Sequence, residues 1–295
     1  MPKVSVVIPT YNHAPFLKKA LESVCAQTMD DWEAIIVNNY SEDDTVAVVE
    51  AINDPRISLI NFRNDGVIAA SRNVGIKKAQ APWVAFLDSD DLWRPNKLAL
   101  CLADLNEDTD VISHPEIIIR DGLQQGATKT GSAARAAYKC LLFDGNIFSP
   151  SAILVKKDLL EKLSGFSEDP QLITAEDYDL WLRIAKSGVR VRFLADHLSE
   201  YTLHEANSIN AFEKHLAANL TVLDRHYTAI EQKSIRDGLR YRRAKALTIY
   251  GAGRLCHNTG NPAQALKYFG QAFLVYPLIL KLYVAISLSV IKLAF

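Results

Sequence analysis

Trp83 to Asp91 reads W-V-A-F-L-D-S-D-D, in which an apolar segment runs directly into a cluster of aspartates. The fold class can be argued from this junction. The first half of the stretch is apolar and rich in aromatic and aliphatic residues, which predicts a buried strand. The strand runs directly into Asp88, Asp90 and Asp91. Carboxylates this close raise one another's pKa unless a cation or hydrogen bonds compensate them, so one interpretation is a divalent-metal site at the end of a strand. The other is a polar turn that caps a helix beginning near Pro95.

Strands and helices alternate along the first third of the chain. Apolar runs predict strands at 3–8, 32–37, 57–60 and 83–87, and apolar residues at helical spacing predict helices at 14–27, 45–51 and 66–79. This rhythm predicts a parallel sheet with helices on both faces. Ligands of such sheets bind beyond the carboxyl ends of the strands, so the polar segments 10–12, 38–39 and 88–90 are expected to converge on one crevice. No glycine-rich dinucleotide fingerprint or P-loop follows the first strand, which argues against both of those classes.

Length and composition permit one α/β domain with an appendage. The chain has 295 residues, of which 49% are apolar, enough for a sizeable core. Its four cysteines lack metal-site spacing and are expected to be buried thiols in a reducing compartment. The apolar run near the N-terminus is too short for a signal peptide, so we expect a cytoplasmic protein.

Charge divides the chain into two parts. Residues 1–232 hold 23 Lys and Arg against 33 Asp and Glu, whereas residues 233–295 hold 10 Lys and Arg against Asp237 alone. A basic tail of this kind indicates an anionic partner, either a membrane surface or nucleic acid, or else a solvated basic face.

Five short motifs occur in order along the chain. They are V-S-V-V-I-P-T-Y-N at 4–12, I-I-V-N-N-Y-S-E-D-D-T at 35–45, A-S-R-N-V-G-I at 70–76, F-L-D-S-D-D at 86–91 and E-D-Y-D-L-W-L-R at 176–183. In this order and at this spacing they resemble the motifs of family 2 glycosyltransferases of the bacterial cell-surface polysaccharide type, over about residues 3–205. The resemblance implies the α/β GT-A fold, with a mostly parallel central sheet flanked by helices. It also implies an inverting transfer of a sugar from a UDP-, GDP- or dTDP-sugar to a hydroxyl of a glycan or lipid-linked acceptor.

The resemblance assigns roles to residues around the predicted crevice. Asp90 is the implied direct ligand of Mg²⁺ or Mn²⁺, while Asp88 lies near the ribose or reaches the metal through water. His204 is either a further metal-side residue or structural. Contacts to the nucleotide are implied for Pro9, Thr10, Tyr11, Asn12, Asn39, Arg72, Asp88 and Ser89.

The chain departs from the family at Asn38 and Asn39, where two aspartates are usual. An amide oxygen can still accept a hydrogen bond from a base, so the change bears on base specificity.

The acceptor side is expected around the fifth motif. Asp177, with Glu176 beside it, is the implied general base, and a first-turn helix cap is the alternative. Trp181 lies one helical turn further on and is either a platform for the acceptor or part of the core. Ser149, in the loop at 146–151, is also implied on the acceptor side.

Three regions are expected. Residues 1–210 form the catalytic domain, with the nucleotide sugar bound by 1–110 and the acceptor by 111–210. Residues 211–277 form a helical extension with a tetratricopeptide-like hairpin. Residues 278–295 form an apolar helix that lies on the cytoplasmic face of the inner membrane, helped by the basic residues before it, or that is buried or contacts a second copy.

Two other functions remain open from the sequence. A nucleotidyltransferase that makes sugar nucleotides should carry a glycine-rich, basic loop after its first strand, and Thr10 to Pro15 has neither feature. A catalytically inactive nucleotide- or glycan-binding module would explain Asn38 and Asn39 as a sign of lost activity. No nucleic acid partner is expected for either function or for the transferase.

Overall fold

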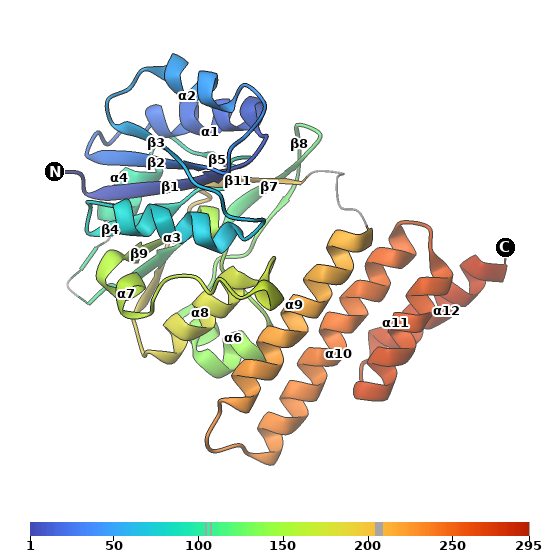
Figure 1. The fold of residues 1–295 in the computed structure, drawn as a ribbon. Coiled ribbons are helices and arrows are strands. Elements are labelled where there is room, and N and C mark those ends of the chain that lie inside the picture. Colours follow the sequence, from blue (N-terminus) through green and yellow to red (C-terminus); the bar gives the residue numbers. More distant parts are fainter. Residues whose placement is uncertain (104, 107, 204–208, 295) are drawn as a thin grey trace.

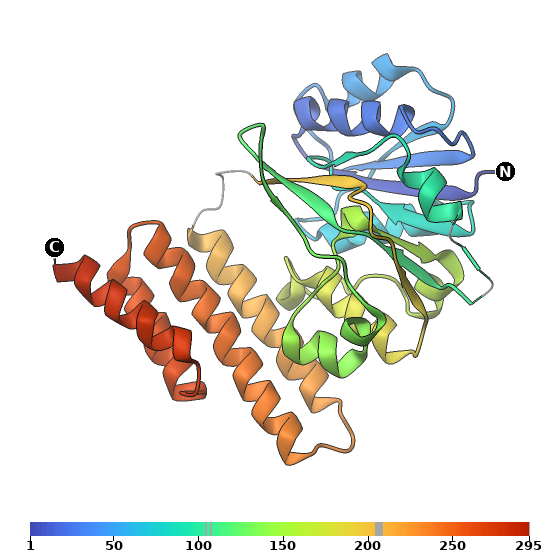
Figure 2. The same cartoon turned by 180° about the vertical axis from the view of Figure 1, so that it is seen from behind.

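The computed structural model describes residues 1–103, 105–106, 108–203 and 209–294 (Figure 1). An α/β part holds the first two thirds of the chain, and long helices that lie side by side form the rest (Figures 1 and 2).

The centre of the α/β part is a sheet to which the described residues contribute seven strands, in the order β10–β6–β9–β4–β1–β2–β3. Their bounds are β1 (Val4–Thr10), β2 (Trp32–Asn38), β3 (Ile57–Asn61), β4 (Trp83–Phe86), β6 (Val111–Ser113), β9 (Ile153–Lys156) and β10 (Val191–Phe193). Strand β1 pairs in parallel with β2 and β4, and β2 pairs in parallel with β3, whereas β9 is antiparallel to β4 and β6. The predicted fold class, an α/β fold with a mostly parallel sheet, is confirmed.

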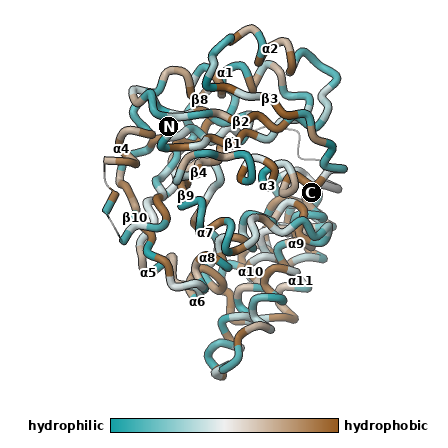
Figure 3. The backbone as a smooth tube through the Cα atoms, turned by 60° about the vertical axis from the view of Figure 1, so that its left-hand side comes forward, coloured by the Kyte–Doolittle hydropathy of each residue, from teal (hydrophilic) through white to brown (hydrophobic). Residues whose placement is uncertain are grey.

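Helices cover both faces of this sheet. On one face, α1 (Ala14–Cys25) packs against the alternate residues Val4, Val6 and Ile8 of β1, close to α2 (Thr45–Ile52). On the other face, α3 (Ile68–Lys78) packs against Val7. Every residue of β1 is buried, as expected of a strand covered on both sides. Figure 3 shows hydrophobic residues along β1 and β2.

A glycine permits the close approach of α3 to the sheet. At Gly75 an added Cβ would collide with the side chain of Val7. Only a residue without a side chain fits there, and this contact fixes the position of Arg72, one turn earlier on the same helix.

A smaller sheet adjoins the carboxyl end of β4. Within the described residues its order is β5 (Leu92–Trp93), β11 (Ser199–Leu203), β7 (Glu116–Arg120) and β8 (Leu123–Ala127). Shorter helices complete the α/β part: α4 (Lys97–Ala103), α5 (Ala133–Ala136), α6 (Tyr138–Asp144), α7 (Lys157–Lys162) and α8 (Glu176–Lys186).

The remaining helices are α9 (Ile209–Thr228), α10 (Ile235–Asn258), α11 (Pro262–Val275) and α12 (Leu280–Ala294). Helix α9 joins the α/β core through Val222 and Leu223, and Tyr227 stacks on Tyr241 of α10 with ring centroids 3.9 Å apart. The other three helices share a second core. Helices α10 and α11 pack against each other, and Asn261 caps the start of α11 by accepting a hydrogen bond from the Gln264 N–H.

No described helix combines the length and the hydropathy needed to cross a bilayer.

Candidate active site

Arg72 joins the two predicted halves of the site. Its Nη2 donates to Asp88 Oδ1 and its Nη1 donates to Glu176 Oε1, both at 2.7 Å. The guanidinium is almost completely buried. Burial alone would lower its pKa, but the two carboxylates more than offset this effect, so the pKa is raised above its ordinary value. Arg72 therefore fixes the end of β4 against the start of α8, and the buried guanidinium orients the carboxylates rather than facing the crevice itself.

Asp177 lies beside this pair in the first turn of α8 and is half-buried. Burial raises the pKa of its carboxyl to about 7, the neighbouring Glu176 adds to the rise, and Arg72 opposes it. A carboxylate with such a pKa can accept a proton near neutral pH.

The Glu176 carboxylate has a structural role. Its Oε1 accepts from Arg72, and its Oε2 accepts from the Thr174 N–H at 2.8 Å. Since both oxygens are engaged, Glu176 positions Arg72 and the loop before α8.

Ser151 holds the aspartate segment, Asp88 to Asp91, in place through hydrogen bonds. Its Oγ accepts from the Asp88 N–H at 3.0 Å and is also hydrogen-bonded to the carboxyl of Asp91. Its carbonyl oxygen accepts from Trp93 Nε1 at 3.0 Å and from Lys97 Nζ at 2.6 Å. Both Ser151 and Lys97 are fully buried, and burial lowers the pKa of Lys97 to about 7.

Asp91 supports the segment and does not cap the next helix. Its Oδ1 accepts from the Thr202 N–H of β11 at 3.0 Å, and burial raises the pKa of its carboxyl well above the ordinary value. Helix α4 begins only at Lys97. The capping interpretation is therefore wrong for Asp91.

The ends of β1 and β2 meet as predicted. The Asn39 N–H donates to the Thr10 carbonyl at 3.0 Å, the Asn12 N–H donates to Ser41 Oγ at 2.9 Å, and Asn12 Oδ1 accepts from the Glu42 N–H at 2.8 Å. Tyr11, beside them, is 54% exposed, whereas Pro9 and Thr10 are buried.

A contact at the start of α1 links these turns to the aspartate segment. His13 Nδ1 lies 3.0 Å from Ser89 Oγ, and Ser89 follows Asp88 directly. The three polar segments predicted to converge are thus brought together.

Asn38 is part of the fold. Its Oδ1 accepts from the N–H and the Oγ of Ser41, and its Nδ2 donates to Asn61 Oδ1 at 2.8 Å. A carboxylate at this position could not donate to Asn61. The Asn38 amide therefore satisfies both its donor and its acceptor partners. Asn39 is half-buried, and its Oδ1 accepts from the Asn64 N–H at 2.9 Å.

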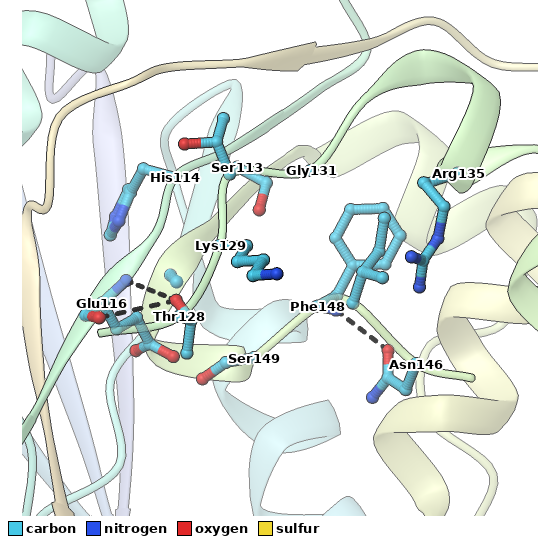
Figure 4. A pocket seen from close by; sticks show the side chains of 13 residues that line it. Ser113, His114, Glu116, Thr128, Lys129, Gly131, Arg135, Asn146, Phe148 and Ser149 are labelled. Atoms are coloured by element: carbon cyan, nitrogen blue, oxygen red, sulfur yellow. Dashed lines mark hydrogen bonds between the residues drawn. The ribbon is translucent and has the colours of Figure 1, made fainter. Parts of the chain in front are cut away.

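A cavity of about 360 Å³ is lined by residues between Ser113 and Ala152, within the predicted acceptor-binding region (Figure 4). Glu116 and Thr128 lie on one side of it, Arg135 and Asn146 on the other, and Ser149 lies beside Glu116. Ser149 also forms a hydrogen bond to the Glu116 carboxyl, whose pKa burial raises. Polar and charged side chains thus line a space large enough for a sugar ring.

Two predicted site residues fall elsewhere. Trp181 is completely buried, 6.0 Å from the Phe166 ring and 6.1 Å from the Phe148 ring, so it packs in the core and its ring cannot form an acceptor platform. His204 lies outside the described residues.

The aspartates fit a hard cation only in part. Asp88 and Asp90 are both half-buried at the end of β4, and their oxygens are the ligands that Mg²⁺ and Mn²⁺ prefer. Among the described residues, no group of three His, Cys, Asp or Glu could hold a metal by itself. The donor set therefore fits a cation that completes its shell with water or with oxygens of a bound ligand.

Sequence reasoning missed the roles of Ser151 and Thr174. A serine before a strand carries no signal that it will hold two aspartates from another loop. Thr174 has a φ of 80°, which is unfavourable for a β-branched residue, and the bond from its N–H to Glu176 holds it there. Nothing in the sequence around Thr174 indicates this conformation.

Comparison with known proteins identifies the family. The profile described as "Glycosyl transferase family 2" matches residues 5–164. The chain belongs to glycosyl transferase family 2. The chain is similar to the putative colanic acid biosynthesis glycosyl transferase WcaA of Escherichia coli K12, with 30% identity over 62% of this chain and 66% of WcaA.

Another relative is an E. coli protein named UDP-Glc:alpha-D-GlcNAc-diphosphoundecaprenol beta-1,3-glucosyltransferase WfgD, 29% identical over 72% of this family 2 chain and 81% of WfgD. Some relatives are much longer. An uncharacterized glycosyltransferase of Rickettsia bellii is 34% identical, and the matched region spans 26% of its length.

Solved structures confirm the GT-A fold. The S. aureus TarS fragment 1–349 in complex with UDP aligns with a TM-score of 0.63 at 21% identity, over 93% of this chain and 81% of the fragment. The Pyrobaculum calidifontis mannosyltransferase PcManGT, in complex with GDP-Man and Mn²⁺, aligns with a TM-score of 0.59 at 21% identity, over 99% of this chain and 85% of the PcManGT chain. These alignments extend into the helical part of the chain.

Proposed function

We propose that this protein transfers a sugar, with inversion, from a nucleotide-diphosphate sugar to a hydroxyl of a glycan or lipid-linked acceptor. The observation that carries the proposal is the buried Arg72, which forms ion pairs with both Asp88 and Glu176. It thereby joins Asp88, on the donor side, to the start of α8, where Asp177 lies. Membership of glycosyl transferase family 2 supports the reaction class.

The donor nucleotide lies, in this proposal, over the joined ends of β1 and β2. The exposed ring of Tyr11 offers a flat surface to a base, and the polar turns at Asn12 and Asn39 offer hydrogen bonds. TarS in complex with UDP and PcManGT in complex with GDP-Man, which share this fold, support a nucleotide ligand.

The diphosphate lies, in this proposal, at the end of β4, where Asp90 and Asp88 would hold a Mg²⁺ or Mn²⁺ ion. This cation, when bound, neutralises the charge that develops on the leaving diphosphate. The Mn²⁺ ion in the PcManGT complex supports the choice of metal.

Asp177 serves as the general base. It takes the proton of the acceptor hydroxyl while that oxygen attacks the anomeric carbon, and the bond from this carbon to the diphosphate oxygen breaks on the opposite face. The electron pair leaves with the diphosphate, so the configuration inverts. The pKa of about 7 keeps a useful fraction of Asp177 deprotonated at neutral pH.

The acceptor lies, in this proposal, in the cavity lined by Ser149 and Glu116. Several of its lining side chains are polar or charged, and its lining residues Ser149 and Ala152 flank Ser151, which holds Asp88. The diphosphoundecaprenol in the name of WfgD supports a lipid-linked acceptor. We propose that the reaction takes place at the cytoplasmic face of a membrane.

Nucleotide binding can be measured before any acceptor is known. Titration calorimetry with UDP, GDP and dTDP in the presence of Mn²⁺ is expected to show one preferred nucleotide. Tyr11→Ala should weaken its binding by roughly 5- to 150-fold, because stacking of a base on an aromatic ring contributes about 1–3 kcal/mol.

Tyr283→Ala is the matched control, since Tyr283 of α12 is similarly exposed, at 48%, and lies outside the site. Unchanged binding in both variants would remove Tyr11 from the nucleotide site. No binding of any nucleotide by the intact protein would favour a glycan-binding module instead.

A further inference from the structure

The outer face of α12 is apolar and uncovered. The inner face packs on α10 and α11 through Leu282, Ala285 and Ser289, which are all buried, as is Ile279 directly before the helix. Along the outer face every large apolar side chain is between 48% and 85% exposed: Leu280, Tyr283, Val284, Leu288, Val290 and Ile291. We call these six residues the α12 apolar face. A contiguous exposed surface of this kind marks an interaction site.

The face continues onto the neighbouring helix. Phe273 of α11 is 39% exposed, and its ring meets the Tyr283 ring edge-on, with centroids 5.9 Å apart. Figures 1 and 2 both show α12 at the outer edge of the helical part, on the side away from α9 and the sheet. The face is therefore open to a large partner.

The helices around this face carry charge of one sign. From residue 238 to residue 295 the sequence contains eight Lys and Arg and no Asp or Glu. Lys281 and Lys292 lie along one edge of the apolar face, and both lean toward α10: Lys281 Nζ lies 4.7 Å from the Tyr250 ring centroid, and Lys292 Nζ donates to the His257 carbonyl at 2.9 Å. Both side chains remain exposed, as do Arg254 and Lys267 on the two neighbouring helices.

We propose that the α12 apolar face docks on a membrane that contains anionic lipids. An apolar helix face with lysines along its edge can enter the boundary between headgroups and acyl chains, and basic residues are attracted to the negative surface. A second copy of this chain is a poorer match, because two acid-free basic surfaces would meet without any opposite charge. Because one side of α12 is already packed, the helix lies along the surface with only its outer side in lipid.

Vesicle sedimentation tests this contact without any need for catalysis. The purified protein is expected to sediment with vesicles of phosphatidylcholine and phosphatidylglycerol, to bind vesicles of phosphatidylcholine alone more weakly, and to be released as salt is added. The variant Val284→Asp/Ile291→Asp, which changes two exposed residues, should bind the anionic vesicles at least about tenfold more weakly, since it places charge in the apolar face.

Leu123→Asp is the control, because Leu123 of β8 is 66% exposed and lies outside the helical part. Its vesicle binding should equal that of the unchanged protein. Light scattering in the absence of lipid supplies the second measurement. Failure of the unchanged protein to bind either vesicle, equal binding by the double variant, or a dimer that the double variant converts to a monomer would each overturn the proposal.

Discussion

Replacing Asp177 with asparagine is expected to lower the rate of sugar transfer by roughly 10²- to 10⁴-fold, the usual contribution of a positioned general base. Asparagine keeps the size of the side chain and its place in the first turn of α8, but it cannot take a proton from the acceptor. Binding of the nucleotide should be unchanged, because it does not involve this group. Initial rates and calorimetry on the same preparation check the two expectations.

The pH dependence follows from the same residue. Because burial and Glu176 raise the pKa of Asp177 to about 7, the carboxyl is protonated and inactive below that pH and becomes competent above it. The transfer rate of the unchanged protein should therefore fall as the pH drops through about 7.

Asp158→Asn is the matched control. Asp158 also lies in the first turn of a helix, α7, but outside the site. If Asp177 served only as a helix cap, both variants would lose at most about 1 kcal/mol of stability and neither would lose activity. Equal rates for Asp177→Asn and Asp158→Asn would contradict the assignment of the base.

Replacing Arg72 with methionine is expected to lower the free energy of unfolding by about 3–5 kcal/mol, because it leaves Asp88 and Glu176 close together without their shared cation. The guanidinium is 4% exposed and satisfies a carboxylate on each side, so water cannot take its place. Denaturant titration followed by fluorescence measures the loss. Transfer activity should disappear with it, since the two halves of the site lose their connection.

Arg56→Met is the comparison. Arg56 also bridges two carboxylates, those of Asp54 and Asp30, and lies over the Trp32 ring, but its side chain is 31% exposed. Water screens such a pair, so the expected loss is only about 1–2 kcal/mol. Equal losses in the two variants would show that burial of Arg72 contributes nothing.

The sheet could be predicted from the sequence because its signals are local. Fully buried parallel strands appear as short apolar runs, and each expected strand from β1 to β4 lies within three residues of its observed ends. The convergence of the turns after β1, β2 and β4 follows from the topology alone. The second sheet could not be predicted in this way, because β5 contains two residues and pairs with β11, about one hundred positions later.

Individual side chains were harder to place. Trp181 follows Asp177 by one helical turn, but only the position of α8 decides that its ring lies between Phe148 and Phe166. Arg72 was expected to meet the nucleotide, whereas its buried position between two carboxylates depends on the approach of α3 to β1 at Gly75. Both outcomes depend on packing between distant segments, which the spacing of residues in the sequence does not record.

Hydrolysis and transfer of UDP-, GDP- and dTDP-sugars by the purified protein test the central claim most directly. The reactions are run with Mn²⁺ or with EDTA, beside the variant Asp90→Ala. We expect one donor to be consumed in the presence of Mn²⁺, with the activity lost in EDTA and in the variant. Consumption of no donor, or consumption that neither EDTA nor Asp90→Ala reduces, would contradict the account.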